Sequence, residues 1–206
     1  MWGGVDVLIP ESVSAFVHDG GIRRAVRELI DLPTDEIFDG MAWSELARFY
    51  RAQLAARQLE SEWAVFALDL WNAVWGGLLD HWTALTPDEQ MMSDADVGLN
   101  LASLSDTDDG SLWFGRLFTT RSSTFYASLG ALPSSGLRLK VSCEKGDRSI
   151  AFTNLGAVPD EYGNWTSHLA LPLDAGEIDP APLRELAAAA LRIADEAITP
   201  RRRAKS

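Results

Sequence analysis

The stretch that decides the fold is residues 112–144, LWFGRLFTTRSSTFYASLGALPSSGLRLKVSCE. Runs of aromatic and aliphatic residues are separated there by turn residues, RSS and PSSG, which is typical of antiparallel strands joined by tight turns. In the last run the odd-numbered residues from Leu137 to Cys143 are apolar and the even-numbered residues from Arg138 to Glu144 are polar. Because strand side chains alternate between two faces, this pattern predicts a sheet with one covered and one solvated face.

Shorter apolar runs flank this stretch at residues 97–101, 149–155 and 168–173. Together they predict an antiparallel sheet of about five to six strands, a meander, within residues 96–175. Whether this sheet is open or closes into a barrel is left open. A further short strand is predicted where Val5, Val7 and Ile9 alternate with other residues before Pro10.

The chain before the sheet has helical periodicity. Residues 22–30 predict a helix that Pro33 stops. The dominant pattern spans residues 42–83, with Ser44 as the expected N-cap and apolar residues recurring at intervals of three and four. A break near Glu60–Glu62 is expected, although one helix and two helices both fit. Thr86–Glu89 has the form of a capping box that opens a short helix.

After the sheet, Asp179 is the expected cap of a long, alanine-rich helix over residues 179–199 that packs on the sheet. Pro200 stops this helix, and residues 200–206 form a basic tail that we expect to be flexible. The prediction is therefore an α+β fold in a single domain, residues 1–199. Residues 1–95 form its mainly helical part and residues 96–175 its antiparallel sheet.

The charge of the chain is divided unevenly between its two halves. Of the net charge of −12, residues 1–110 contribute −14, from 20 acidic and 6 basic side chains, and residues 111–206 contribute +2, from 10 acidic and 12 basic ones. Such asymmetry bears on partners rather than on fold. An acidic half repels phosphate backbones, so direct nucleic-acid binding is disfavoured and a basic protein surface is favoured.

Several function classes lack their motifs in this sequence. Cys143 is the single cysteine, which excludes an internal disulfide and cysteine-rich zinc sites. The sequence contains neither of the glycine-rich phosphate-binding motifs G-x-x-x-x-G-K-[ST] and G-x-G-x-x-G. It also lacks a pair of histidines at metal-binding helical spacing and the G-x-S-x-G motif of a serine nucleophile. Because these motifs are missing, we expect no cofactor. No signal peptide or membrane-spanning pattern is evident, so we expect a cytoplasmic protein. These features favour a non-enzymatic protein.

Two alternatives remain open. The carboxylates between Asp94 and Asp109 suit a hard cation and would serve a metal-dependent hydrolase or nuclease, although neither register of the run at residues 105–117 completes a calcium-binding loop. The second alternative is a small-ligand carrier, in which the sheet and the C-terminal helix enclose a pocket lined by Trp113, Phe125 and Phe152.

The preferred hypothesis is an acidic protein-binding module, an inhibitor that engages a basic partner. That partner would be a nucleic-acid-binding protein such as a defence or restriction effector, in which acids of this chain occupy phosphate sites. Five of the eight tryptophans lie between Trp43 and Trp82, and aromatics among acids are typical of interface hot spots. The predicted contact residues are Glu60, Glu62, Asp69, Trp75, Asp80, Asp88 and Glu89. The oligomeric state is left open.

Overall fold

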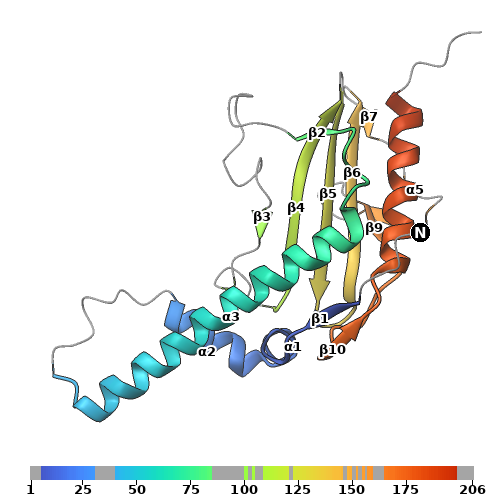
Figure 1. Ribbon diagram of the computed structural model, residues 1–206. Helices are drawn as coiled ribbons and strands as arrows, with labels where there is room; N and C mark the ends of the chain where they lie inside the picture. The colour runs from blue at the N-terminus through green and yellow to red at the C-terminus, as the bar shows by residue number, and fades with distance from the viewer. Residues whose placement is uncertain are drawn as a thin grey trace, which may run out of the picture.

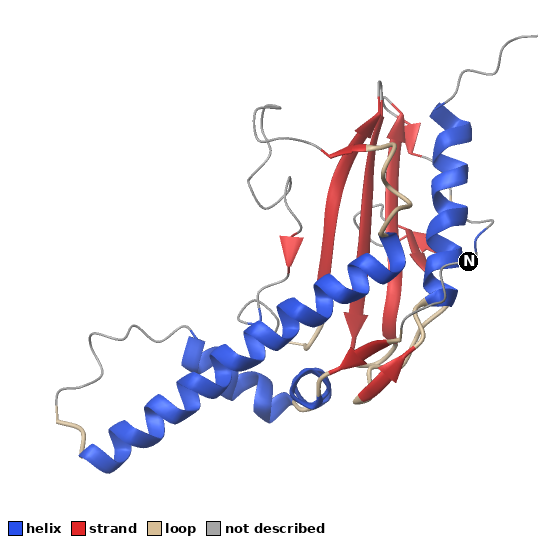
Figure 2. Ribbon diagram, in the orientation of Figure 1, coloured by secondary structure: helices blue, strands red, loops and turns tan. Residues whose placement is uncertain are grey.

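Among the residues that it describes, the computed structural model has four helices and two antiparallel sheets in an α+β arrangement (Figures 1 and 2). The structure describes residues 6–30, 40–84, 100–101, 104, 109–120, 123–145, 148–149, 152, 155, 157–159 and 165–198. The predicted α+β class and the antiparallel pairing are confirmed. The expected helix at Thr86–Glu89 and the basic tail lie outside the described residues.

The main sheet is built on three long consecutive strands. These are β4 (Leu112–Thr120), β5 (Ser123–Leu132) and β6 (Gly136–Lys145), which pair in sequence order as the predicted meander. Short strands extend the sheet among the described residues: β2 (Thr83–Ala84), β3 (Asn100–Leu101), β7 (Arg148–Ser149), β8 (Ala157–Pro159) and β9 (Trp165–Ser167). The strand order β2-β4-β5-β6-β9-β8 departs from a simple meander, because β9 lies beside β6 and β8 pairs on its far side.

One face of this sheet is buried, as the alternation predicts. Leu137, Leu139 and Val141 of β6 are buried, whereas Arg138 and Lys140 between them are half-exposed. The neighbouring strands continue this buried face in register. Phe114 of β4 lies opposite Leu129 of β5, which in turn lies opposite Leu139 of β6. This face therefore forms the floor of the core.

Two helices cover the buried face (Figure 1). Helix α3 (Trp43–Trp75) crosses it with its C-terminal part, where Trp63 packs edge-on against Phe114 with ring centroids 5.5 Å apart. Helix α5 (Ala181–Ile198) packs beside β6 and begins with the Ala181 N–H donating to the Asp179 carboxylate at 2.9 Å, as predicted. The longest helix is α3 in the N-terminal half rather than the C-terminal helix.

Helix α3 runs without interruption through Glu60–Glu62, so of the two alternatives left open one helix is correct and no break occurs there. It begins one residue before Ser44, with Ala42 at the N-cap, and the Ala42 N–H donates to the Glu45 carboxylate at 3.2 Å. It ends at Trp75 with Gly76 as its C-cap, so the helical pattern expected to residue 83 stops earlier. The guanidinium of Arg184 in α5 donates to the carbonyls of Ala73 and Val74 at 3.0 and 3.3 Å, and so satisfies acceptors that the helix end leaves open.

Beside the middle of α3 lie α1 (Glu11–His18) and α2 (Gly20–Ile30) (Figure 1). Strand β1 (Val7–Ile9), which the sequence predicts, pairs with β10 (Gly176–Ile178), and this pair forms a separate two-stranded sheet. The first half of α3 extends beyond the main sheet (Figure 1). Consequently much of this helix has a face that no described part of the sheet covers.

Candidate protein-binding surface

Four of the seven predicted contact residues are accessible on α3 and the turn after it. Glu60 and Glu62 are half-exposed, and Asp69 and Asp80 are exposed. Helix α3 places Glu62 and Asp69 seven residues apart, two turns along one side of the helix. The remaining predicted acids, Asp88 and Glu89, lie outside the described residues.

Trp75 cannot contact a partner in this structure, so its assignment as a contact residue is wrong. Its side chain is 0% exposed and lies against Phe125 of β5, with ring centroids 6.0 Å apart and an interplanar angle of 73°. Trp63 and Trp82 are buried as well. These tryptophans attach α3 and the turn after it to the sheet, which uses their large apolar area for the core.

The apolar neighbours of the α3 acids are aliphatic rather than aromatic. Val65 and Leu68 are both exposed, and both lie between Glu62 and Asp69 in sequence and on the solvent side of the helix. The one strongly exposed tryptophan of α3, Trp43, lies at its opposite end. The exposed apolar residues beside the acids of α3 are therefore aliphatic, and not tryptophans as the sequence predicted.

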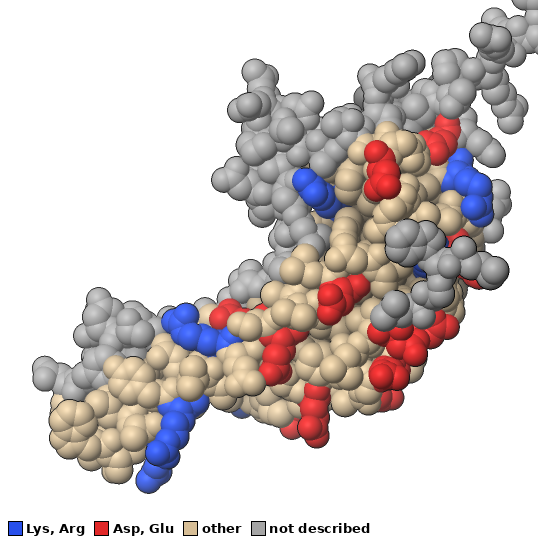
Figure 3. Space-filling model, in the orientation of Figure 1, with Lys and Arg blue, Asp and Glu red and all other residues tan. Residues whose placement is uncertain are grey.

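Acidic side chains continue beyond α3 onto the elements beside it. Figure 3 shows them over the C-terminal part of α3 and over the region of α1, β1 and β10, whereas basic side chains lie toward the N-terminal end of α3. Glu11 and Glu177 are exposed there, and Leu8, which lies opposite Glu177 in the β1–β10 pair, is 65% exposed. We define the acidic surface as Glu11, Glu60, Glu62, Asp69, Asp80 and Glu177. On α3 it spans the solvent side of the helix, with Glu60 on one edge and with Glu62 and Asp69 on the other.

Sequence reasoning missed Glu11, Glu177 and the exposed Leu8. The available signal was weak: Leu8 interrupts the alternation of Val7 and Ile9 with an apolar residue on the solvent side. Glu177 reaches the same surface only because β10 pairs with β1, more than 160 residues earlier in the chain. No local pattern identifies that pairing.

Glu62 is held in its charged form by two donors. The Ser12 hydroxyl of α1 donates to one carboxylate oxygen, and the Gln58 side-chain amide donates to the other at 2.8 Å. These bonds, the one from Ser12 first, lower the pKa of Glu62 below its usual value. Since the folded-state pKa is lowered, the stabilisation is present above the ordinary pKa of glutamate and is lost as the pH falls through the lowered value.

Replacing Ser12 by alanine is therefore expected to raise the pKa of Glu62 toward its ordinary value, with the Gln58 bond retaining part of the effect. The titration of the Glu62 carboxyl carbon by NMR measures it. Ser61→Ala is the matched control, because the Ser61 hydroxyl donates to the Arg57 carbonyl at 3.2 Å and not to Glu62. An equal pKa in the Ser12→Ala and Ser61→Ala variants would contradict the assignment.

The carboxylate cluster proposed for a metal is described only at Asp109. This side chain accepts from the Ser111 N–H at 2.8 Å and from the Ser111 hydroxyl at 2.7 Å, and these bonds lower its pKa. Its oxygens are thus engaged in a local turn. Among the residues that the structure describes, no three His, Cys, Asp or Glu side chains lie close enough to hold a metal ion. The other aspartates of the cluster, Asp94 to Asp108, lie outside them.

The residues proposed for a ligand pocket do not form one. Trp113 lies on the opposite face of β4 from its buried neighbours Leu112 and Phe114, whereas Phe125 and Phe152 are fully buried in the core.

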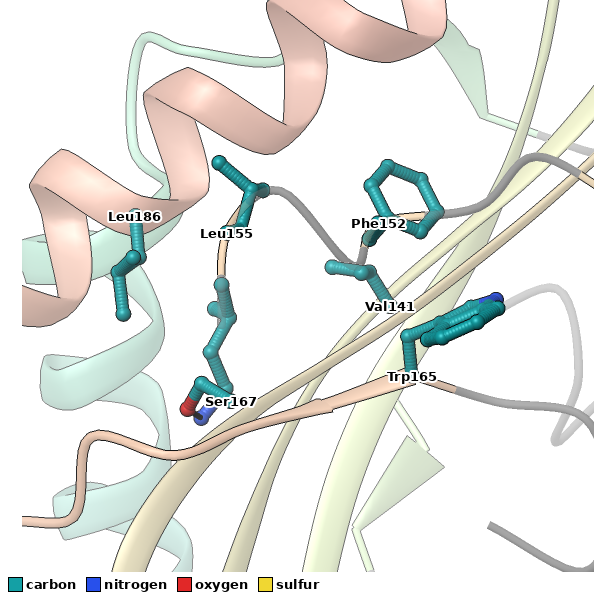
Figure 4. A pocket seen from close by; sticks show the side chains of 7 residues that line it. Val141, Phe152, Leu155, Trp165, Ser167 and Leu186 are labelled. Atoms are coloured by element: carbon teal, nitrogen blue, oxygen red, sulfur yellow. Dashed lines mark hydrogen bonds between the residues drawn. The ribbon is translucent and has the colours of Figure 1, made fainter. Parts of the chain in front are cut away.

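A cavity does lie between β6, β9 and α5, but its volume is about 10 Å³. Figure 4 shows it between Leu186 of α5, Val141 of β6 and Trp165 of β9. A space of that size holds about one water molecule, so this cavity does not support the carrier alternative.

Comparison of the chain with protein-family models, with curated proteins and with solved structures yields no match. Among its described helices none is both long enough and apolar enough to cross a membrane. The function is therefore inferred from the surface alone.

Proposed function

We propose that this chain is a non-enzymatic protein-binding module that engages a basic partner through its acidic surface. The observation that carries the proposal is the set of accessible acids on the C-terminal part of α3 and on the neighbouring α1 and β10, with Val65 and Leu68 exposed on α3 between Glu62 and Asp69. Aliphatic contact supplies affinity when water is excluded, and the surrounding charge supplies orientation and association rate.

The partner chemistry follows from the sign of the charge. A surface rich in lysine and arginine complements these carboxylates, and arginine in particular forms paired hydrogen bonds with them. Proteins that bind nucleic acids carry such surfaces for phosphate. The chain would then act as an inhibitor, occupying the phosphate sites of a nucleic-acid-binding partner such as a defence or restriction effector.

The partner is first identified by affinity purification of the tagged chain from its native host. Its affinity is then compared for two variants with the same net charge. One variant neutralises the α3 side of the surface, with Glu60→Gln, Glu62→Gln, Asp69→Asn and Asp80→Asn. The control variant, Glu28→Lys with Glu185→Lys, reverses two exposed acids outside the surface. Each variant raises the net charge from −12 by four.

The first variant is expected to lose at least about tenfold in affinity, and the control no more than about twofold, because only the first removes charges that face the partner. Surface plasmon resonance at low and high salt measures this, and the wild-type affinity should fall as salt screens the charges. Equal losses in the two variants would show that net charge, and not this surface, governs binding.

The inhibitor role has its own test. The partner, once identified, is offered a labelled DNA or RNA duplex with and without the chain, and the chain should displace the nucleic acid in proportion to its occupancy. If the chain, its partner and the nucleic acid instead form a ternary complex, the chain binds the partner but does not inhibit it.

A further inference from the structure

The solvent face of α3 is unusually apolar for an exposed helix face. We define the α3 seam as the residues that follow one another along this face at intervals of three or four. They are Trp43, Ala47, Tyr50, Leu54, Gln58, Ser61, Val65, Leu68 and Asn72, and all nine are exposed. Trp43 is 86%, Leu54 69% and Val65 59% exposed.

The seam lies opposite the core side of the helix. The buried residues of α3 include Ala56, Leu59, Trp63, Phe66 and Leu70, which pack on the sheet and on the N-terminal helices. At 3.6 residues per turn these positions and the seam occupy opposite sides of the helix. Helix α3 is thus apolar on both sides, and a helix of that kind is normally covered on both.

The spacing of the seam is that of a helix which packs lengthwise against another helix. Intervals of three and four residues keep one line of side chains facing a partner at a small crossing angle. At 1.5 Å per residue the line from Trp43 to Asn72 is about 44 Å long. The first half of α3 projects beyond the main sheet, so a second helix has access to this line (Figure 1).

The charges along α3 favour a second copy of the same helix. Up to Arg57 the helix carries three arginines and one glutamate, and from Gln58 to Trp75 it carries three acids and no base. A parallel pair of such helices brings like halves together, whereas an antiparallel pair brings each basic half against an acidic half. From these observations we propose that α3 forms an antiparallel homodimer through its seam.

The seam is nearly symmetric about the point between Gln58 and Ser61. In an antiparallel pair centred there, Gln58 faces Ser61 of the second copy and Leu54 faces Val65 of the second copy. Tyr50 and Leu68 come within one residue of level, so apolar pairs lie on both sides of a polar centre. A polar pair within an apolar seam fixes register and direction, since any shift leaves polar groups against aliphatic ones.

The edges of the seam match as well. In a twofold antiparallel pair the same edge of each helix meets, so residues on one edge pair with residues of that edge in the second copy. Arg51 and Asp69 lie on one edge, so Arg51 of each helix lies opposite Asp69 of the second copy. Arg57 and Glu60 share the other edge and come within two residues of level. The symmetry repeats each ion pair, giving two pairs on either edge.

This inference goes beyond the proposed function and does not depend on it. The two share Glu60, Val65, Leu68 and Asp69, so a second copy and a different partner would compete for this face of α3. Sedimentation velocity of the purified full-length chain tests it without a partner. The expected result is a concentration-dependent species with twice the 22.6 kDa mass of one chain. A monomer over the whole concentration range would overturn the proposal and leave the binding function untouched.

Charge exchange tests the direction and register. Arg51→Glu and Asp69→Arg are each expected to raise the dissociation constant of the dimer about tenfold, because each sets like charges against one another. The double variant restores opposite charges and should return to within about threefold of wild type. Two additive losses in the double variant would overturn the register.

The apolar contact has a matched control. Leu54→Asp with Leu68→Asp should raise the dissociation constant at least about a hundredfold, because it puts four charges into the seam of each dimer. Leu8→Asp on β1 makes one such substitution at a leucine about as exposed as Leu54 but outside the seam, and it should leave the dimer unchanged. Equal behaviour of the two variants would overturn the role of the seam.

Cross-linking completes the test in a Cys143→Ser background. Leu54→Cys combined with Val65→Cys should form an interchain disulfide on oxidation. The two positions are about 16 Å apart within one helix, too far for an internal bond. Leu54→Cys alone should remain uncross-linked, because in an antiparallel pair these residues are far apart. Cross-linking of the Leu54→Cys single variant would show a parallel pair and overturn the proposal.

Discussion

Replacement of Trp75 by alanine is expected to lower the free energy of unfolding by about 3–5 kcal/mol. The indole is 0% exposed and lies against Phe125, and Phe125 also lies against Trp82 with ring centroids 5.1 Å apart. The substitution leaves a void at the point where α3, the turn after it and β5 meet. Because the surrounding backbone belongs to a helix end and a central strand, it cannot collapse readily into that void.

Trp75→Phe separates the ring from the indole N–H. The N–H of Trp75 is buried and has no hydrogen-bond partner among the described residues. Phenylalanine keeps the aromatic contact with Phe125 and removes a polar group whose burial is unfavourable, so the loss of stability should stay below about 2 kcal/mol. Urea unfolding followed by far-ultraviolet circular dichroism measures both variants.

Trp43→Ala is the matched control, since it removes the same side chain from the other end of the same helix, where it is 86% exposed. Measured at a concentration that keeps the chain monomeric, it should change stability by less than about 0.5 kcal/mol. A Trp75→Ala variant no less stable than Trp43→Ala would contradict the packing of Trp75 against Phe125.

These two tryptophans also show where sequence reasoning reaches its limit. Helix α3 is recognisable from the spacing of its apolar residues, although it ends at Trp75 and not at residue 83. Because apolar residues occur on both sides of this helix, periodicity cannot decide which side faces the sheet. The sequence pattern therefore assigns Trp75 to the surface, although it lies in the core, and does not identify Val65 and Leu68 as exposed.

The strands show the same limit: the buried face of a strand can be predicted from its own residues, but its pairing with a distant strand cannot. The covered face of β6 is predictable because Leu137, Leu139 and Val141 alternate with polar residues, and the start of α5 is predictable because Asp179 is a good cap. The pairing of β1 with β10 is not, because it joins chain segments more than 160 residues apart. That pairing carries Glu177 to the acidic surface, so this part of the candidate site required the three-dimensional structure.

The expected break in α3 at Glu60–Glu62 has a similar explanation. Two acids with a serine between them lower helix propensity only slightly, and neither glycine nor proline occurs there. In the structure Glu62 accepts hydrogen bonds from Ser12 of α1 and from Gln58 one turn earlier. A contact with another helix thus supports the segment that local reasoning marks as weak.

Gly136→Ala is the second substitution for which we expect a large loss, on the order of 2–4 kcal/mol. Gly136 opens β6 after the turn at residues 133–135, with φ at +71°, and a methyl group there would lie 2.1 Å from the Leu171 carbonyl oxygen. Leu137 and Leu171 exchange two backbone hydrogen bonds, of 2.7 and 3.0 Å. The methyl group must displace the backbone that forms this bridge.

Two further variants separate the clash from the strain of a positive φ. Gly40 has φ at +91°, and beyond its chain neighbours no described atom lies within 4 Å of the position that a methyl group would take. Gly40→Ala should therefore lose only about 1–2 kcal/mol from strain. Gly136→Asn introduces a residue that tolerates left-handed backbone at the crowded site, yet it carries the same Cβ. If the Leu171 carbonyl is the cause, Gly136→Asn should be as destabilising as Gly136→Ala, and amide exchange at Leu137 and Leu171 should accelerate in both variants. A mild effect of asparagine at this position would instead assign the loss to backbone strain.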